Sequence, residues 1–291
     1  MQQRRIGREH VGAIGLGEMP MSIEGRPDEA RSIETIHAAL DAGITLVDTA
    51  DAYSLGGDET GHGERLVAKA LASWDGDRGS VLVATKGGHT RPGDGSWAVN
   101  SDPAYLRSAA EASLRRLRVE AIGLYQYHRP DPKVPYEVAV GAFKDLLDAG
   151  KVRMVGISNA NVAQIDLARS VLGDGNLASV QNQFSPAFRS SEDELRYCGE
   201  LGIAFLPWSP FGGIGNADRL RAEHPAFGRV AASHGVSVHQ VVLAWMLAKG
   251  EHVVPIPGAS RPSSATDCAG AADLKLGEDE LRLLDADEPE G

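Results

Sequence analysis

The chain has 291 residues, of which 42% are hydrophobic, and its 29 Lys and Arg against 40 Asp and Glu give a formal net charge of -11. This charge disfavours nucleic acid and anionic membrane as partners, because both attract positive surfaces. Cys198 and Cys268 form neither a disulfide framework nor a metal-ligand motif. Since no apolar run suits a signal peptide or a membrane span, we expect a cytoplasmic protein.

Predicted strands and helices alternate along the whole chain. A glycine-rich strand over 11–17 is not a dinucleotide-binding fingerprint, because Pro20 stands in place of the third glycine. Apolar runs predict further strands over 44–48, 80–86, 122–128, 152–157, 179–185, 203–210 and 252–258. Helix starts are marked by Asp28, by Asp102 before Pro103, by Asn161 with Gln164, by Ser191 with Glu194, and by Ser237 with Gln240. These units predict a single-domain α/β fold over residues 1–291, a (β/α)8 TIM barrel.

Two segments carry expectations about exposure. Residues 87–100 predict a long loop, in which Trp97 either covers the substrate as a lid or packs within the loop. The helix that begins at Pro103 has an apolar stripe, and the arginines outside that stripe are expected to be solvated. They are Arg107, Arg115 and Arg116.

Three successive apolar runs each end in a titratable side chain: Asp48, Lys86 and His128. A buried acid needs a cation, and Lys86 is the candidate partner of Asp48. Tyr53 lies in the loop five residues after Asp48. Since the carboxyl ends of barrel strands share one face, we expect all four side chains in one pocket. There Lys86 would lower the pKa of Tyr53, which would protonate a carbonyl oxygen that His128 also contacts.

Each of these residues alone is more often structural, but their joint placement at successive strand ends is more specific. In order and context, Asp48, Tyr53, Lys86 and His128 resemble the catalytic tetrad of the aldo-keto reductases. The resemblance extends from residues 15–17 to 256–258, and it points to the bacterial branch and to pyridoxal-reductase-like members. It implies a barrel enzyme that reduces aldehydes and ketones with NADPH, or alternatively NADH, and that requires no metal.

The second half of the chain offers groups that can hold a nicotinamide. Ser158, Asn159 and Gln181 end neighbouring strands and offer hydrogen bonds to a carboxamide, although Ser158 and Asn159 suit a strand-end turn equally well. Trp208 can stack on the ring. The resemblance implies that the pyrophosphate and adenosine lie across 209–215 and the loop after Gly258. Its further candidates are Ser209, Phe211, Gly212, Gly258, Ser260, Arg261, Ser264 and Asp267.

This cofactor segment departs from better-studied family members. Gly258 stands where those often have a lysine, Ser264 where many have an arginine or histidine, and Cys268 where asparagine is usual. Asp267 occupies the position of an acid that contacts adenine. Arg261 is the only cation in the loop and is the candidate for a 2′-phosphate. These departures put the preference for NADPH over NADH in doubt, because a 2′-phosphate is best held by a bidentate arginine.

Met19, Trp97 and Arg129 lie on loops expected to shape the substrate site, which also include residues 212–221. They suggest a mostly apolar pocket with one cation, which suits small aromatic aldehydes and could admit pyridoxal. The protein is expected to be a monomer or a weak homo-oligomer.

Two other functions stay open on the same fold. A lyase could form a Schiff base on Lys86, but this leaves Asp48, Tyr53 and Trp208 unexplained. A non-catalytic nicotinamide-binding regulator is the second alternative, and the intact tetrad argues against it. The fold alone discriminates none of these, because one barrel supports many functions.

Overall fold

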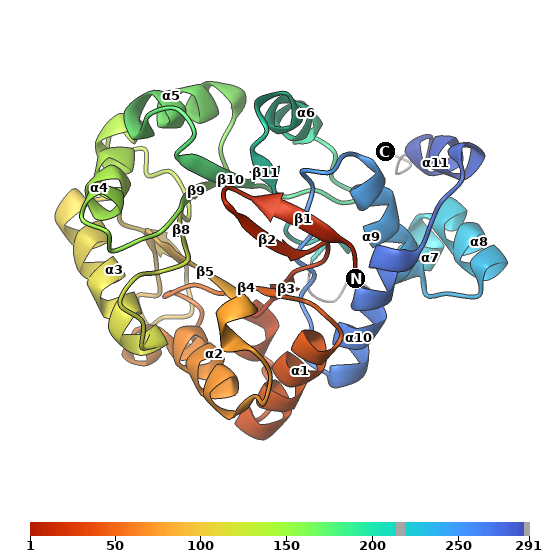
Figure 1. The fold of residues 1–291 in the computed structure, drawn as a ribbon, viewed down its shortest axis with the longest axis horizontal. Coiled ribbons are helices and arrows are strands. Elements are labelled where there is room, and N and C mark those ends of the chain that lie inside the picture. The colour runs from red at the N-terminus through yellow and green to blue at the C-terminus, as the bar shows by residue number, and fades with distance from the viewer. Residues whose placement is uncertain (214–218, 288–291) are drawn as a thin grey trace.

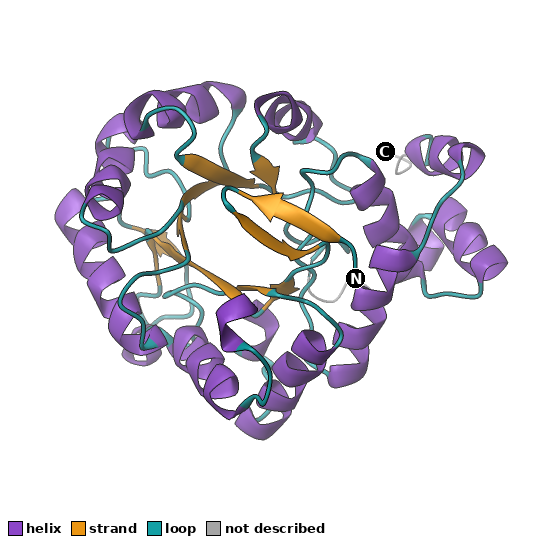
Figure 2. Cartoon of the chain, viewed as in Figure 1, coloured by secondary structure: helices purple, strands orange, loops and turns teal. Residues whose placement is uncertain are grey.

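Helices surround an inner layer of strands in the computed structural model, which describes residues 1–213 and 219–287 (Figure 1). The strands are β1 (Gln3–Ile6), β2 (Glu9–Gly12), β3 (Leu16–Gly17), β4 (Leu46–Asp48), β5 (Leu82–Gly87), β6 (His89–Thr90), β7 (Ala98–Val99), β8 (Leu124–Tyr127), β9 (Val155–Ser158), β10 (Leu177–Gln181) and β11 (Ala204–Phe205). The α-helices are α1 (Glu29–Asp41), α2 (His62–Ser73), α3 (Pro103–Leu117), α4 (Tyr136–Asp148), α5 (Val162–Leu172), α6 (Glu192–Leu201), α7 (Leu220–Glu223), α8 (Pro225–His234), α9 (Val238–Ala248), α10 (Pro262–Gly270) and α11 (Glu278–Asp285). Figure 2 shows the strands on the inside and the helices on the outside.

The central sheet is parallel and curled, with seven strands in the order β11-β10-β9-β8-β5-β4-β3. Residues 252–258 hydrogen-bond to both of its edges: Gly17 N donates to Pro257 O at 2.9 Å, and Phe205 N donates to His252 O at 2.8 Å. This segment forms isolated bridges and no regular strand. Its two prolines lack the N–H groups that a continuous ladder needs. The predicted eighth strand is therefore not formed as such, and a closed eight-stranded barrel is not shown.

The amino-terminal segment differs from the single strand predicted over 11–17. β1 and β2 form an antiparallel hairpin, and only Leu16 and Gly17 join the central sheet. Ile6 and Val11 of the hairpin are fully buried among apolar side chains that the curled sheet encloses, and each such burial contributes roughly 1.5–3 kcal/mol. Gly12 N donates to Thr45 Oγ1, immediately before β4 begins. The hairpin thus covers the amino-terminal ends of the strands.

Four of the five predicted helix caps are formed. The side chains of Asp28, Asp102, Asn161 and Ser237 accept backbone N–H groups of the first turn, and Asn161 forms the full capping box with Gln164. The predicted cap at Ser191 is wrong, because its side chain makes no such bond. Its φ of -97° and ψ of 16° lie outside the extended region that N-cap residues adopt.

Residues 87–100 are not a plain loop. β6 and β7 pair as an antiparallel hairpin in which His89 lies opposite Val99 and Thr90 opposite Ala98. Gly93 has a φ of 105°, which the turn requires and which a residue with a side chain rarely adopts. The hairpin fixes the direction of the side chains on either side of the turn.

The predicted solvation of Arg116 is also wrong. Arg116 Nε forms an ion pair with Glu64, whose side chain is fully buried. Glu64 also accepts a hydrogen bond from Thr85 Oγ1 at 2.7 Å. A buried carboxylate without a partner is costly, so α3 contributes the cation that α2 requires.

The carboxy-terminal helices pack around α9, in which residues 241–247 are all buried. Trp245 is fully buried and stacks on Phe184 with ring centroids 5.4 Å apart. Among the described helices, none alone is long and apolar enough to cross a membrane. α8 and α9 pass that test only as a pair, and they are bent by 101°.

Candidate active site

Asp48, Lys86 and Gln126 all point into the curled sheet, each two residues beyond an apolar side chain of the enclosed core. Those core residues are Leu46, Ala84 and Leu124, and side chains alternate along a strand, so the polar groups share their direction. Asp48 therefore lies at the carboxyl end of β4, and Lys86 lies on the neighbouring strand β5.

The four tetrad side chains lie together. Lys86 Nζ forms an ion pair with Asp48 Oδ1 and donates to Tyr53 Oη at 3.1 Å. It also donates to the carbonyl oxygen of Thr49 at 3.0 Å. The His128 ring lies edge-on to the Tyr53 ring, with centroids 5.7 Å apart and an interplanar angle of 81°. A phenol, an ammonium group and an imidazole are thus concentrated at one point.

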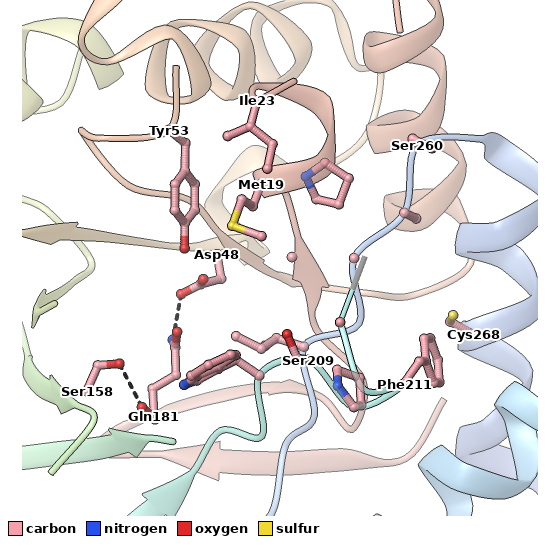
Figure 3. A pocket seen from close by; sticks show the side chains of 18 of the residues that line it. Met19, Ile23, Asp48, Tyr53, Ser158, Gln181, Ser209, Phe211, Ser260 and Cys268 are labelled. Atoms are coloured by element: carbon pink, nitrogen blue, oxygen red, sulfur yellow. Dashed lines mark hydrogen bonds between the residues drawn. The ribbon is translucent and has the colours of Figure 1, made fainter. Parts of the chain in front are cut away.

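Two amides fix the carboxylate of Asp48. Gln126 Nε2 and Gln181 Nε2 each donate to Asp48 Oδ2 at 2.9 Å, and Figure 3 shows the bond from Gln181. Gln181 was expected to hold a carboxamide, but its amide nitrogen is used here to orient Asp48. Gln126 was not singled out in the sequence, although a glutamine inside an apolar run was the available signal.

A pocket of about 700 Å³ extends from the tetrad to α10. Figure 3 shows Tyr53 and Asp48 on one side of it and Phe211 and Cys268 on another. It is lined by every predicted cofactor and substrate residue except Gly212, whose neighbours Phe211 and Gly213 do line it. Residues 214 and 215, also predicted to contact the cofactor, lie outside the described residues. Lining residues not singled out before include Pro20, Ile23, His89, His239, Ile256 and Ala259.

Known proteins share this fold and sequence over nearly the whole chain. The sequence model of the Aldo/keto reductase family matches residues 13–288. The chain belongs to the aldo/keto reductase family. A probable aldo-keto reductase 1 from Glycine max is 35% identical over 98% of this chain and 88% of its own length. The predicted family is thereby confirmed, and it is a family of oxidoreductases, whereas the bacterial branch and the pyridoxal-reductase-like members stay predictions.

Two solved structures are similar to this protein over nearly the whole of both chains. A glycerol dehydrogenase from Gluconobacter oxydans matches with a TM-score of 0.83 and 29% identity, covering 97% of this chain and 94% of that one. An aldo-keto reductase from Klebsiella pneumoniae, crystallised with NADPH, matches with a TM-score of 0.80 and 28% identity, covering 100% of this chain and 98% of that one. The present protein is therefore described below as a nicotinamide-dependent aldo-keto reductase.

The pKa of Tyr53 differs from the expectation. Burial raises the pKa of this phenol above its ordinary value, and burial outweighs the Lys86 ammonium group, which lowers it. For Lys86, burial alone would lower the pKa, but Asp48 and Tyr53 together raise it. Tyr53 is thus protonated and Lys86 charged at neutral pH. The predicted lowering was wrong because it neglected the cost of forming a phenolate away from water.

His128 is accompanied by a second histidine that the sequence had not marked. His89, on β6, stacks on His128 with ring centroids 4.2 Å apart. Burial lowers the pKa of His89 to about 4, with Arg129 and Lys86 contributing, and burial lowers the pKa of His128 well below its usual range. Both rings are neutral at pH 7, so each has one N–H to donate. Only the β6–β7 hairpin brings His89 to this position.

Trp97 packs over the tetrad from the same hairpin. Its ring lies edge-on to Tyr53 with centroids 6.4 Å apart, and it is 41% exposed. The Arg91 guanidinium lies 4.4 Å from the Trp97 ring centroid and donates to Leu55 O at 3.2 Å. Trp97 therefore lies over the pocket, and its movement as a lid stays a prediction.

The residues predicted to bind the carboxamide of the cofactor hydrogen-bond to one another. Ser158 Oγ donates to the carbonyl oxygen of Gln181 at 2.7 Å. Asn159 Nδ2 donates to the carbonyl oxygen of His128 and to Ser158 Oγ, both at 3.0 Å. Among the described residues, Trp208 Nε1 is buried with no partner. Asn159 is thus held at the pocket wall, and Trp208, which also lines the pocket, has an indole N–H available for a hydrogen bond.

One departure at the α10 end of the pocket, Gly258, has a packing explanation. A Cβ added to Gly258 would lie 2.7 Å from Pro20 Cγ, so the proline occupies the space that the usual lysine would need. Asp267 accepts hydrogen bonds from Ser237 Oγ at 2.6 Å and Gln240 Nε2 at 2.7 Å. Arg261 is exposed at the N-cap of α10 and forms no ion pair with a described residue. Arg261 is therefore free to hold an anionic group.

Cys268 and the acidic residues of the pocket offer no metal centre. Burial raises the pKa of the Cys268 thiol to about 12, which keeps it neutral. Across residues 1–213 and 219–287, no group of three or more His, Cys, Asp or Glu side chains is arranged to hold a metal ion.

Proposed function

We propose that this protein reduces small aldehydes and ketones to alcohols with NADPH, and that Tyr53 donates the proton. The observation that carries the proposal is the Tyr53 hydroxyl at the pocket wall, 3.1 Å from the Lys86 ammonium group. Membership of the aldo/keto reductase family supports the reaction class. The relative crystallised with NADPH supports the cofactor.

The residues of the pocket fit a nicotinamide dinucleotide. The pocket volume of about 700 Å³ lies within the range of cofactor sites, and Trp208, whose N–H has no partner among the described residues, lines the pocket together with the tetrad residues Asp48, Tyr53 and His128. At the other end, Arg261 and the N-terminus of α10 provide positive charge for phosphate. Ser260 and Ser264 would add hydroxyl donors there. The unpaired Arg261 favours NADPH over NADH.

In the proposed reduction the cofactor provides the hydride, and side chains of the protein provide the proton and stabilise the charges. When bound, the cofactor supplies a hydride to the carbonyl carbon. Tyr53 Oη donates a proton to the carbonyl oxygen as negative charge develops on it. Lys86 stabilises the phenolate that remains, and Asp48 keeps Lys86 charged and in place. The neutral His128 donates a hydrogen bond to the same oxygen and orients the substrate.

The pocket wall near the tetrad favours a flat, compact substrate. Met19, Ile23 and Trp97 provide apolar surface, and His89 and Trp208 add flat rings. Aromatic aldehydes suit this surface, and pyridoxal is a substrate to test among them.

We also propose that residues 252–258 take the place of an eighth strand of the barrel. Their hydrogen bonds to both edges of the central sheet support this proposal.

The environment of Lys86 disfavours the Schiff-base alternative. A nucleophilic lysine must lose its proton, whereas the pKa of Lys86 is raised by its ion pair with Asp48. Borohydride reduction in the presence of a carbonyl substrate would trap a Schiff base. Absence of a stable adduct at Lys86 is the expected result.

Wild type and Tyr53→Phe should be compared with NADPH and with NADH over a panel of aldehydes and ketones that includes pyridoxal. We expect kcat to fall by about 10²- to 10⁴-fold in Tyr53→Phe, the usual contribution of a positioned general acid. Cofactor affinity, followed by quenching of tryptophan fluorescence, should be unchanged. Equal turnover by the variant would remove Tyr53 from the mechanism. Cofactor binding without turnover by the wild type would favour the regulator.

A further inference from the structure

Arg129 is a positively charged residue at the pocket that lacks an ion-pair partner among the described residues. Of the described charged residues that line the pocket, Asp48 is neutralised by Lys86, and Asp267 and Arg261 lie at the α10 end. Arg129 directly follows His128 and forms no ion pair with a described residue. Its Nη2 donates only to the neutral amide oxygen of Asn159, at 3.2 Å. At the substrate end of the pocket an exposed guanidinium group therefore has no counter-charge among the described residues.

Besides its partner Asn159, Arg129 lies close enough to two stacked histidine rings to act on them electrostatically. The stacked rings of His89 and His128 are both neutral at pH 7, and Trp97 lies 5.5 Å from His89, centroid to centroid. Arg129 contributes to this neutrality, because its positive charge lowers the pKa of both histidines. An aromatic ring that contacts this wall would carry its substituents toward a positive, partly open rim.

From this juxtaposition we propose a substrate class, which rests on the function proposed above. The substrate is an aromatic aldehyde with an anionic substituent, and Arg129 selects it by a charge-assisted hydrogen bond to that substituent. The planar guanidinium group can bind either a carboxylate or a phosphate in two-point fashion. In a protein of net charge -11, an anionic substrate would otherwise be repelled by the surface.

Two matched pairs of aldehydes test the proposal and distinguish the anion. The first pair is 4-carboxybenzaldehyde and its methyl ester, and the second is pyridoxal 5′-phosphate and pyridoxal. We expect kcat/KM to be about tenfold higher for the charged member of at least one pair, the scale of a hydrogen bond to a charged group. The pair that shows the preference identifies carboxylate or phosphate. Since Arg129 is exposed, the preference should shrink in 0.5 M salt.

Arg129→Gln should abolish the preference for the charged member, while Arg129→Lys should retain part of it. Arg115→Gln is the matched control, because it removes an exposed arginine on α3 that has no ion pair with a described residue. Equal kcat/KM within both pairs, or a preference that survives Arg129→Gln, overturns the proposal.

A binding measurement separates this proposal from the failure of the reductase function. The alcohols 4-(hydroxymethyl)benzoate and its methyl ester should be titrated against wild type and Arg129→Gln by tryptophan fluorescence, since Trp97 and Trp208 line the pocket. Tighter binding of the acid by the wild type alone supports Arg129 even if no aldehyde is reduced. Equal binding of acid and ester by the wild type counts against it.

Discussion

Replacing Glu18 by glutamine should flatten the pH dependence of folding stability between pH 4.5 and 8. Glu18 is fully buried directly after β3 and accepts a hydrogen bond from Thr49 Oγ1 at 2.9 Å. It also contacts Ser22, whose Oγ lies 2.9 Å from His62 Nδ1. Burial raises the pKa of Glu18 from 4.5 to about 8, so the folded protein holds this proton at neutral pH.

The sign follows from which state binds the proton. Between pH 4.5 and about 8 the unfolded chain has lost the Glu18 proton and the folded chain retains it, so rising pH favours unfolding. This contribution to stability is fully present below pH 4.5 and is lost as pH rises through the folded pKa. At about 1.4 kcal/mol per pH unit, the roughly 3.5 units amount to about 5 kcal/mol. Glutamine has no proton to lose, so its variant should lack this slope.

Denaturant unfolding at pH 5, 6, 7 and 8 measures the difference directly. The free energy of unfolding of Glu18→Gln minus that of the wild type should rise with pH by about 1.4 kcal/mol per unit. Glu34→Gln removes an exposed glutamate on α1 and serves as the control for the change in net charge. Parallel pH profiles for wild type and Glu18→Gln would show that Glu18 is ionised in the folded protein and would refute the reasoning.

Two further substitutions test the packing around the site. Arg116→Met leaves the buried Glu64 without its cation and should cost about 3 kcal/mol in denaturant unfolding, whereas Arg115→Met, at an exposed position, should cost less than about 0.5 kcal/mol. Equal costs would mean that Glu64 does not need its partner. Trp97→Ala removes the ring that packs edge-on against Tyr53 and should raise KM for aromatic aldehydes about tenfold in steady-state kinetics, with little change for short aliphatic aldehydes. An equal rise for both substrate types would indicate a general disturbance of the pocket.

The sequence alone located the carboxyl ends of β4, β5 and β8 to within one residue, and four helix caps. Asp48, Lys86 and His128 could be located because each follows an apolar run, and parallel strands place their carboxyl ends on one face. Caps such as Asn161 with Gln164 depend on residues three apart, so local spacing was sufficient. The eighth strand was predicted by the same apolar signal, which does not register that Pro255 and Pro257 interrupt a hydrogen-bond ladder.

Only the tertiary structure decided which groups surround those strand ends. Gln126 meets Asp48 across 78 residues, and Arg116 meets Glu64 across 52, so no local pattern relates the partners. His89 lies on His128 only because β6 pairs with β7. The direction of the pKa shift of Tyr53 likewise depends on how completely the fold removes the phenol from water. Periodicity determines which way a side chain points, whereas burial and long-range contacts determine its charge.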